Sequence, residues 1–256
     1  MESRYLLTLR YLGYGYRGWQ KQPQVKTVQG TLERTILYLT GMERIRTLAA
    51  GRTDAGVSAE AMPVMLITDA PIDPIQLLQD LRETLPADIE ALALVAQPDT
   101  FSILEAVQEK EYRYRFAERP LHPFTAPHLA PTGLILAPEA MLQGAGTFLG
   151  SHDFRAYTYQ PKPDTVTMRE IVGSELIALP PGTLPYQNRP AWEFRVRARG
   201  FLRHQVRLMA GTLMALGQGQ LPMAGLRASL NHPDQTHDYH LAPAEGLTLH
   251  TVVLAL

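Results

Sequence analysis

Apolar residues in the first 100 positions follow two spacings in turn. Residues 5–11 are typical of a strand, and a turn rich in glycine and tyrosine follows as far as Pro23. A helix is then indicated by four apolar residues at helical spacing: Val28, Leu32, Ile36 and Leu39. Gly41 stands where a left-handed cap would end this helix.

Two strands and a second helix are predicted next. Residues 45–50 and 63–68 suit strands, and the turn GRTDAG at 51–56 lies between them. Asp73 and Pro74 are typical of an N-cap and a first helical position. The helix would face four apolar side chains inward: Ile75, Leu78, Leu81 and Leu85. A further strand, at 89–95, gives this half the order βαββαβ.

The second half is predicted to repeat this order. Its strands are expected around 112–116, 170–179, 192–198 and 247–254, and its helices at 138–149 and 202–216. Residues 180–190 resemble an inserted loop and 232–243 a covering loop. The predicted fold class is α/β of the α+β type, with two tandem βαββαβ halves, ferredoxin- or RRM-like, whose antiparallel sheets meet at a central cleft. The N-terminal lobe would span 1–104 and the C-terminal lobe 105–256.

Composition narrows the class of protein. With 256 residues, 45% of them apolar, the chain is long enough for packed cores, which argues against disorder. No apolar run approaches the roughly 20 residues that cross a bilayer, and the start lacks the order of a secretory signal. We therefore expect a cytoplasmic protein without membrane contact. The absence of cysteine excludes disulfides, thiolate nucleophiles and cysteine-ligated metals.

Charge and histidine content restrict the partners. Lys and Arg number 24 against 25 for Asp and Glu, so attraction to a nucleic acid must come from a local patch. His232, His237 and His240 cluster in the late loop, but their spacing matches no helix-borne zinc motif. We expect no structural metal.

A glycine pattern in the first turn matches a dinucleotide-binding fingerprint on paper. Gly13, Gly15 and Gly18 have the G-x-G-x-x-G spacing and follow a strand. In that fingerprint the last glycine opens the helix that holds the pyrophosphate, whereas residues 19–23 intervene here. We reject a dinucleotide site.

The turn GRTDAG is a stronger candidate for chemistry. It places the carboxylate of Asp54 between two glycines and two residues after Arg52. Glycines let the backbone come close to a ligand, and an aspartate among N–H groups and near a cation stays ionised, ready to act as nucleophile or base. The alternative is an Asx-turn that only ties a β-hairpin together.

Two further features fit a nucleic-acid substrate. Tyr112 lies in a strand whose aromatic residues share one face, where it would either stack on a flipped base or fill the core. Arg203 and Arg207 stand four residues apart at the start of the predicted last long helix, as a basic ridge for phosphate. They could equally be solvated, or Arg207 partly buried beside a carboxylate.

These segments together resemble the transfer RNA pseudouridine synthase I family, whose members modify the anticodon stem-loop. The resemblance rests on ordered matches along the chain: YRGWQKQP at 16–23, TVQGTLE at 27–33, GRTDAGVSA at 51–59, LPADI at 85–89, KEYRY at 110–114, FLGSHDF at 148–154, FLRHQVR at 201–207 and APAEGL at 242–247. It implies a two-lobed isomerase, an intramolecular transferase, that works as a homodimer on tRNA without metal, nucleotide or redox cofactor.

The resemblance also implies roles for single residues. Asp54 is the catalytic aspartate, which either attacks the anomeric carbon of a flipped uridine or removes a proton from the neighbouring carbon. Tyr112 packs against the target base, and Arg207 pairs with Asp54 in the cleft. Arg52 follows the RNA backbone, and Arg203 and Lys110 are candidates for phosphate contacts.

The chain departs from the family at several positions. Ser58 stands where a histidine is usual, and the first turn lacks an acidic residue at Leu12 or Gly13. FSIL at 101–104 replaces Phe-His-Ala-Arg, and DTVTM at 164–168 replaces Pro-Val-Arg-Thr-Ile, so two arginines are lost. A diverged paralogue acting on another RNA and a non-catalytic RNA-binding protein are therefore alternatives. A hydrolase of nucleosides or glycosides would need a second carboxylate opposite Asp54, for which the sequence offers no candidate.

Overall fold

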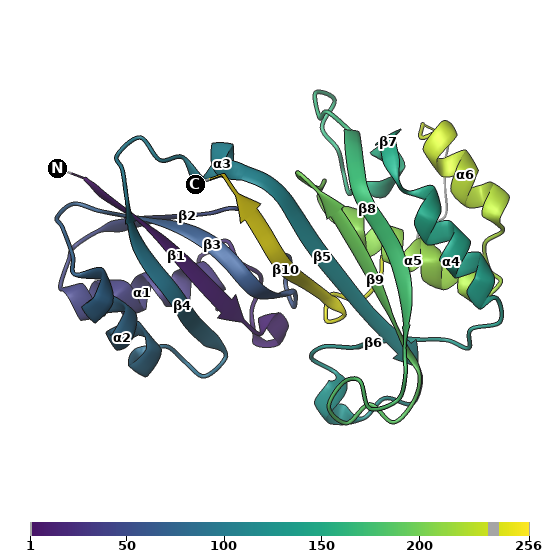
Figure 1. Ribbon diagram of the computed structural model, residues 1–256, viewed down its shortest axis with the longest axis horizontal. Coiled ribbons are helices and arrows are strands. Elements are labelled where there is room, and N and C mark those ends of the chain that lie inside the picture. Colours follow the sequence, from purple (N-terminus) through teal and green to yellow (C-terminus); the bar gives the residue numbers. More distant parts are fainter. Residues whose placement is uncertain (1, 235–240, 256) are drawn as a thin grey trace. The chain divides into compact units, whose positions relative to one another are not determined.

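The computed structural model describes residues 2–234 and 241–255, and the chain divides into two compact units (Figure 1). The first unit comprises Met1–Gln108 with Leu249–Leu256, and the second comprises Glu109–Thr248. Each unit combines β-strands with helices, so the fold is mixed α/β, as the alternating spacings predict. No helix in the described ranges is long and apolar enough to cross a membrane.

The N-terminal unit follows the predicted order βαββαβ. Its elements are β1 (Ser3–Tyr11), α1 (Val28–Thr40), β2 (Ile45–Ala49), β3 (Ser58–Thr68), α2 (Pro74–Thr84) and β4 (Ile89–Gln97). Strand β1 lies between β4 and β3 and pairs antiparallel with both, and β2 pairs antiparallel with β3. The last strand, β10 (Leu247–Leu254), lies on the other side of β3.

Local signals set the ends of the two helices. The Thr27 hydroxyl accepts a hydrogen bond from the Gly30 N–H at the start of α1, and Gly41 ends this helix at φ 65°. The Asp73 carboxylate caps α2 through the next N–H groups, as predicted. Leu81 and Leu85 of the predicted inward face are buried and Leu78 is half-buried, but Ile75 is 80% exposed and Leu77 is buried instead.

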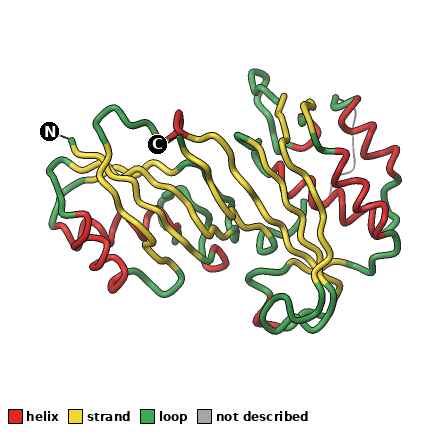
Figure 2. Tube along the Cα trace, viewed as in Figure 1, coloured by secondary structure: helices red, strands yellow, loops and turns green. Residues whose placement is uncertain are grey.

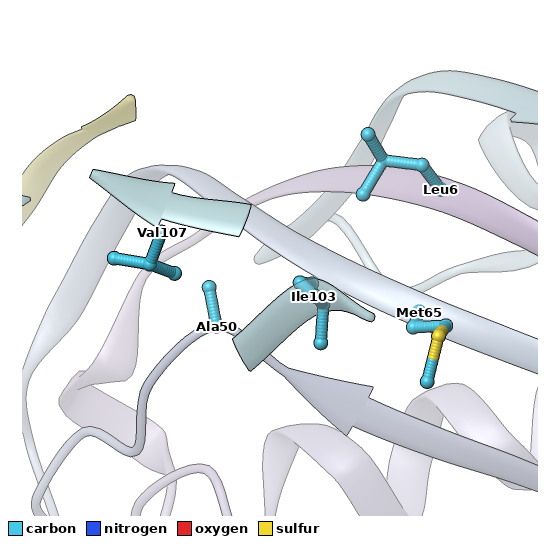
Figure 3. Packing of buried hydrophobic residues seen from close by; sticks show 5 residues of the cluster. All are labelled: Leu6, Ala50, Met65, Ile103 and Val107. Carbon is cyan, nitrogen blue, oxygen red and sulfur yellow. The ribbon is translucent and has the colours of Figure 1, made fainter. Parts of the chain in front are cut away.

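The sheet of the N-terminal unit is covered on both faces. Figure 2 shows α1 and α2 on one side of its strands, where Leu32 and Ile36 of α1 are fully buried. Successive strand residues point to opposite faces, so Leu6 and Met65 lie on the other side. There they pack in a cluster with Ala50, Val107 and Ile103, the last from the short helix α3 (Ile103–Ala106) (Figure 3).

The C-terminal unit contains a sheet with three helices. Its strands run in the order β5-β9-β8-β7, and β6 pairs with β5 in parallel, so the pairing is mixed and not purely antiparallel as expected. The elements are β5 (Val107–Glu118), β6 (Ala130–Thr132), α4 (Pro138–Thr147), β7 (Gly150–Asp153), β8 (Met168–Leu179), β9 (Ala191–Ala198), α5 (Gln205–Gly217) and α6 (Met223–Asn231). Helices α4, α5 and α6 lie on one side of this sheet (Figure 1).

Several of these elements were absent from the prediction. Strands β6 and β7 have three and four residues, too few to show a period of two. Helix α6 contains Gly225 and follows Pro222, which look like loop residues, yet it buries Leu226 and Leu230. The expected covering loop at 232–243 falls partly on 235–240, so His237 and His240 lie outside the described residues.

Candidate functional site

The GRTDAG turn connects β2 and β3 of the N-terminal unit. Its centre is held by a buried residue on each side, Thr53 and Val57, while Asp54 is half-buried and Arg52 is exposed. The N–H of Val57 donates to the carbonyl of Asp54 at 3.2 Å and closes the turn. The carboxylate thus sits on a short segment anchored at both ends by antiparallel strands.

The glycine- and tyrosine-rich turn after β1 is hydrogen-bonded to this segment. The Trp19 N–H donates to the Thr53 carbonyl at 3.1 Å, and the Gly56 N–H donates to the Tyr16 carbonyl at 3.2 Å. Backbone bonds therefore reach the turn from both sides of Asp54. Fixing the backbone in this way positions the side chain for chemistry before a substrate arrives.

Two glycines permit this close approach. A Cβ on Gly13 would lie 2.0 Å from the Val57 carbonyl oxygen, and one on Gly18 would lie 2.8 Å from that of Thr53. Gly18 also has φ 91°, which side chains rarely adopt. The next long helix begins only at Val28, as the rejection of a dinucleotide site requires. The G-x-G-x-x-G spacing thus serves contact between two turns of the chain.

Buried aromatic residues pack next to the GRTDAG turn. The hydroxyls of Tyr11 and Thr53 lie 2.8 Å apart in a buried hydrogen bond, and the Tyr11 ring packs 6.1 Å from that of Trp19. Trp19 itself is fully buried. Sequence reasoning missed these roles, although a tryptophan directly after a glycine-rich turn signals that the turn is packed and not free.

Polar residues of α1 extend the support. The Gln29 amide oxygen accepts from the Lys21 N–H at 2.9 Å, while its NH₂ group donates to Glu33 and Thr47. The Thr47 hydroxyl donates to Glu33 at 2.7 Å. Thr47 belongs to β2, the strand that leads into the GRTDAG turn. This largely buried network therefore joins the turn after β1 to α1 and to β2.

The C-terminal unit holds the predicted aromatic residue on β5. Tyr112 is buried, and its ring meets that of Phe201 edge to face, with centroids 5.3 Å apart. Lys110 lies two residues earlier, on the same side of the strand by alternation. Burial lowers the pKa of the Lys110 ammonium below its ordinary value, because the charged form loses contact with water.

Arg207 is fixed by the chain that precedes β10. Its Nε donates to the Ala242 carbonyl at 2.8 Å, and the Ala242 N–H donates back to the Arg207 carbonyl. The Tyr114 hydroxyl donates to the next carbonyl, that of Pro243, at 2.9 Å. Burial raises the pKa of Tyr114, and the positive charge of Arg207 acts in the opposite direction. The Arg207 guanidinium is therefore fixed by a backbone hydrogen bond and acts electrostatically on the buried Tyr114 hydroxyl.

Arg203 is placed differently from the prediction. Helix α5 begins at Gln205 and is preceded by His204 at φ 62°, so Arg203 lies outside the helix and the spacing of a helical ridge with Arg207 does not apply. Its guanidinium lies over the Tyr159 ring, 5.0 Å from the centroid. Such a stacked arginine keeps its donors available to an anion.

The departures from the family have structural counterparts. The Ser58 hydroxyl accepts a hydrogen bond from the Gly13 N–H at 3.0 Å, so the serine has a role in joining the two turns. Leu104 and Val166 stand where arginines are usual and are 58% and 70% exposed. Among the described residues no group of three His, Cys, Asp or Glu side chains is arranged to hold a metal.

Comparison with known proteins identifies the family. The sequence profile of "tRNA pseudouridine synthase" matches residues 145–253. The chain is similar to tRNA pseudouridine synthase A of Caldicellulosiruptor bescii, with 31% identity over 97% of this chain and 98% of that protein. It is 35% identical to the protein of the same name from Methylobacterium sp. strain 4-46, over 96% of this chain and 95% of that one. The Moorella thermoacetica protein is 34% identical over 96% and 97%. The chain belongs to the tRNA pseudouridine synthase A family.

Proposed function

We propose that this chain isomerises uridine to pseudouridine in the anticodon stem-loop of tRNA, with Asp54 as its essential carboxylate. One observation carries the proposal. The chain aligns along nearly its whole length with synthases of this name, and its Asp54 lies in a turn clamped by backbone hydrogen bonds from a second turn. A rigid carboxylate is what a reaction at a single sugar carbon requires.

The reaction replaces the carbon–nitrogen bond between base and sugar with a carbon–carbon bond. The bond between N1 of uracil and C1′ breaks, the ring turns, and C5 joins C1′. The proton on C5 is then lost and N1 gains one, so the product is an isomer. Asp54 would act either by attacking C1′ or by removing a proton from C2′, and both routes need its ionised form.

Of the remaining predicted residues, Arg207 would belong to the catalytic centre and the others would bind the RNA. Tyr112 would contact the flipped base, since its ring is held by Phe201 in a fixed orientation. Arg207 would pair with the Asp54 carboxylate and orient it. Arg52 is exposed and has no ion-pair partner in the described part of the chain, which suits a backbone phosphate, and Arg203 and Lys110 would add phosphate contacts.

Two further expectations stay proposals. The protein would work as a homodimer without metal or organic cofactor. The two halves would share one βαββαβ plan: when β6, β7 and α6 are set aside, the elements from β5 to β10 follow the order of the first half. A cleft between the halves, carrying the catalytic residues, belongs to this plan.

A second candidate function is RNA binding without turnover. It is favoured by Leu104 and Val166, two exposed apolar residues in place of the arginines that the family usually carries. Weaker RNA contacts with an intact aspartate would fit a diverged paralogue equally well.

The test measures release of tritium from tRNA labelled at C5 of uridine, because isomerisation alone detaches that hydrogen. We expect release by the wild-type chain and none by Asp54→Asn. The control is Asp69→Asn, which removes an exposed carboxylate paired with Arg44 after β3 and should leave the rate unchanged. Absence of release by the wild-type chain would contradict the proposed function, and release by Asp54→Asn would contradict the role of that residue.

A further inference from the structure

Two loops of the C-terminal unit present aromatic rings to solvent at one place. The first loop follows β5 and carries His122 and Phe124, and the second joins β8 to β9 and carries Tyr186 (Figure 1). The rings of His122 and Tyr186 are stacked, with centroids 5.1 Å apart and planes 11° apart. Phe124 meets Tyr186 edge to face at 5.2 Å. We call these three residues the aromatic platform.

The platform is exposed although it is aromatic. Tyr186 is 58% and Phe124 68% exposed. Beside it lies a pocket of about 240 Å³ with a floor of Ala117, Leu121 and Leu129. This volume is below the roughly 300–1,000 Å³ of sites for drug-sized ligands and suits a single planar ring.

The second loop is built to hold Tyr186 in this position. Gln187 is buried, and its side-chain NH₂ donates to the carbonyls of Leu179, Pro180 and Arg189, while its amide oxygen accepts from the Leu184 N–H. Tyr186 itself has φ 59°, a conformation that costs about 1 kcal/mol or more for a residue with a side chain. The backbone strain at Tyr186 thus accompanies a tyrosine ring that lies outside the core.

The first loop fixes its ring as firmly. The Nδ1 atom of His122 accepts a hydrogen bond from the Phe124 N–H at 3.3 Å, and the Thr125 hydroxyl donates to the His122 carbonyl at 2.7 Å. The imidazole is therefore held by its own loop as well as by the stacking on Tyr186. A preformed stack loses little entropy when a further ring joins it.

The charge around the platform selects the class of ligand. Arg189 lines the pocket, and Arg119 directly precedes Pro120, which also lines it. Both arginines are exposed, and neither has an acidic partner within residues 2–234 and 241–255. The pocket lining, which includes Asn188 and Arg189, contains no carboxylate that would repel a phosphate. Stacking rings beside cations are what holds an unpaired nucleotide, through its base and its phosphate.

We propose that the aromatic platform and its pocket bind an unstacked nucleotide of the RNA substrate, other than the uridine that reacts. The base would stack on the Tyr186 ring and meet Phe124 edge to face, since these two rings are inclined by 65°, and Asn188 would read a base edge. Arg189 and Arg119 would hold the adjoining phosphates. The identity of the ligand as RNA rests on the proposed function, while the platform itself rests on the ring geometry and the charges above.

The decisive variant is Tyr186→Gly. It removes the ring but relieves the backbone, because glycine adopts positive φ freely, so the fold should keep or gain thermal stability. Stacking of one base affects binding about tenfold, so we expect KM for tRNA and Kd for fluorescently labelled tRNA to rise by about this factor with kcat unchanged. Tyr186→Phe keeps the ring and should retain the wild-type values.

The cationic part is tested with a matched pair. Arg189→Ala should reduce the salt dependence of tRNA binding by about one phosphate contact, whereas Arg227→Ala, an exposed arginine on α6, should not. Unchanged Kd and KM in Tyr186→Gly would overturn the inference while leaving tritium release, and hence the proposed function, intact. If the wild-type chain releases no tritium, the Kd of the same variants still decides whether the platform binds RNA.

Discussion

The hydroxyl of Tyr11 lies 2.8 Å from the hydroxyl of Thr53, in a buried contact between two residues 42 positions apart. Thr53 immediately precedes the proposed catalytic aspartate, so the hydrogen bond from Tyr11 on β1 helps to fix the position of the turn. A residue that never meets the substrate would then affect the rate by positioning one that does. This makes Tyr11 a positioning residue.

Tyr11→Phe should lower kcat several-fold and leave KM close to the wild-type value. The ring stays, but the Thr53 hydroxyl loses a buried partner, which costs about 1–3 kcal/mol of folding free energy. Tyr5→Phe is the control, because Tyr5 lies on the same strand and its hydroxyl bonds to the backbone of Ile72, away from the turn. If Tyr11 had only a structural role, Tyr11→Phe would lower the unfolding free energy but leave kcat equal to that of Tyr5→Phe.

Gly18→Ala should reduce activity far more than a glycine replacement elsewhere in the unit. The new Cβ would lie 2.8 Å from the Thr53 carbonyl, so the turn before Asp54 must move. Gly41→Ala is the control, because Gly41 also has positive φ but nothing lies near its added Cβ. Both variants should lose about 1 kcal/mol through backbone strain, measured by denaturant unfolding. Only Gly18→Ala should also lose tritium release, and equal rates would contradict the clamp between the turns.

Sequence reasoning succeeded where a signal is local. Gly41 and Asp73 end and begin helices for reasons carried by one residue and its neighbours, and the order βαββαβ follows from spacing. It failed at Ile75, since the inward face of α2 is set by what packs against the helix.

The surroundings of the candidate site could be predicted only in part. The turn with Asp54 stands out in the sequence, but its partner Tyr11 is distant along the chain and resembles any strand tyrosine. The segment 180–190 looked like an insertion rich in proline, yet Gln187 at its centre is buried and organises the loop. Long-range hydrogen bonds of this kind leave no periodic trace.

A buried carboxylate with two arginine partners in the C-terminal unit makes stability depend on pH. Glu193 on β9 accepts from Arg115 and Arg195, each at 2.6 Å. Burial alone would raise the pKa of Glu193, but these two bonds together hold it below its ordinary value. A carboxyl with a lowered folded-state pKa stabilises the fold above its unfolded pKa of about 4.3, and this contribution is lost as the pH falls through the folded value.

Glu193→Gln should therefore cost about 1.5–3 kcal/mol of unfolding free energy near pH 7, because two hydrogen bonds to a charged acceptor are weakened. The difference from wild type should shrink as the pH is lowered below about 4. Urea unfolding at several pH values measures it. Glu175→Gln, which removes an exposed carboxylate 3.7 Å from Arg195, should cost less than 1 kcal/mol at every pH. A pH-independent difference for Glu193→Gln would contradict the assignment.

The two missing arginines provide the last prediction, because they separate substrate binding from chemistry. Leu104 and Val166 are exposed apolar residues, so an arginine at either place needs no rearrangement of the core. The double variant Leu104→Arg, Val166→Arg should bind tRNA more tightly, and the salt dependence of Kd should steepen by about one unit for each phosphate reached. Tyr38→Arg adds one such charge at an exposed position of α1, as each single replacement does, and should produce no such change in slope. If that control acts as strongly as either replacement, the gain is only unspecific attraction, and these positions are no part of the RNA-binding surface.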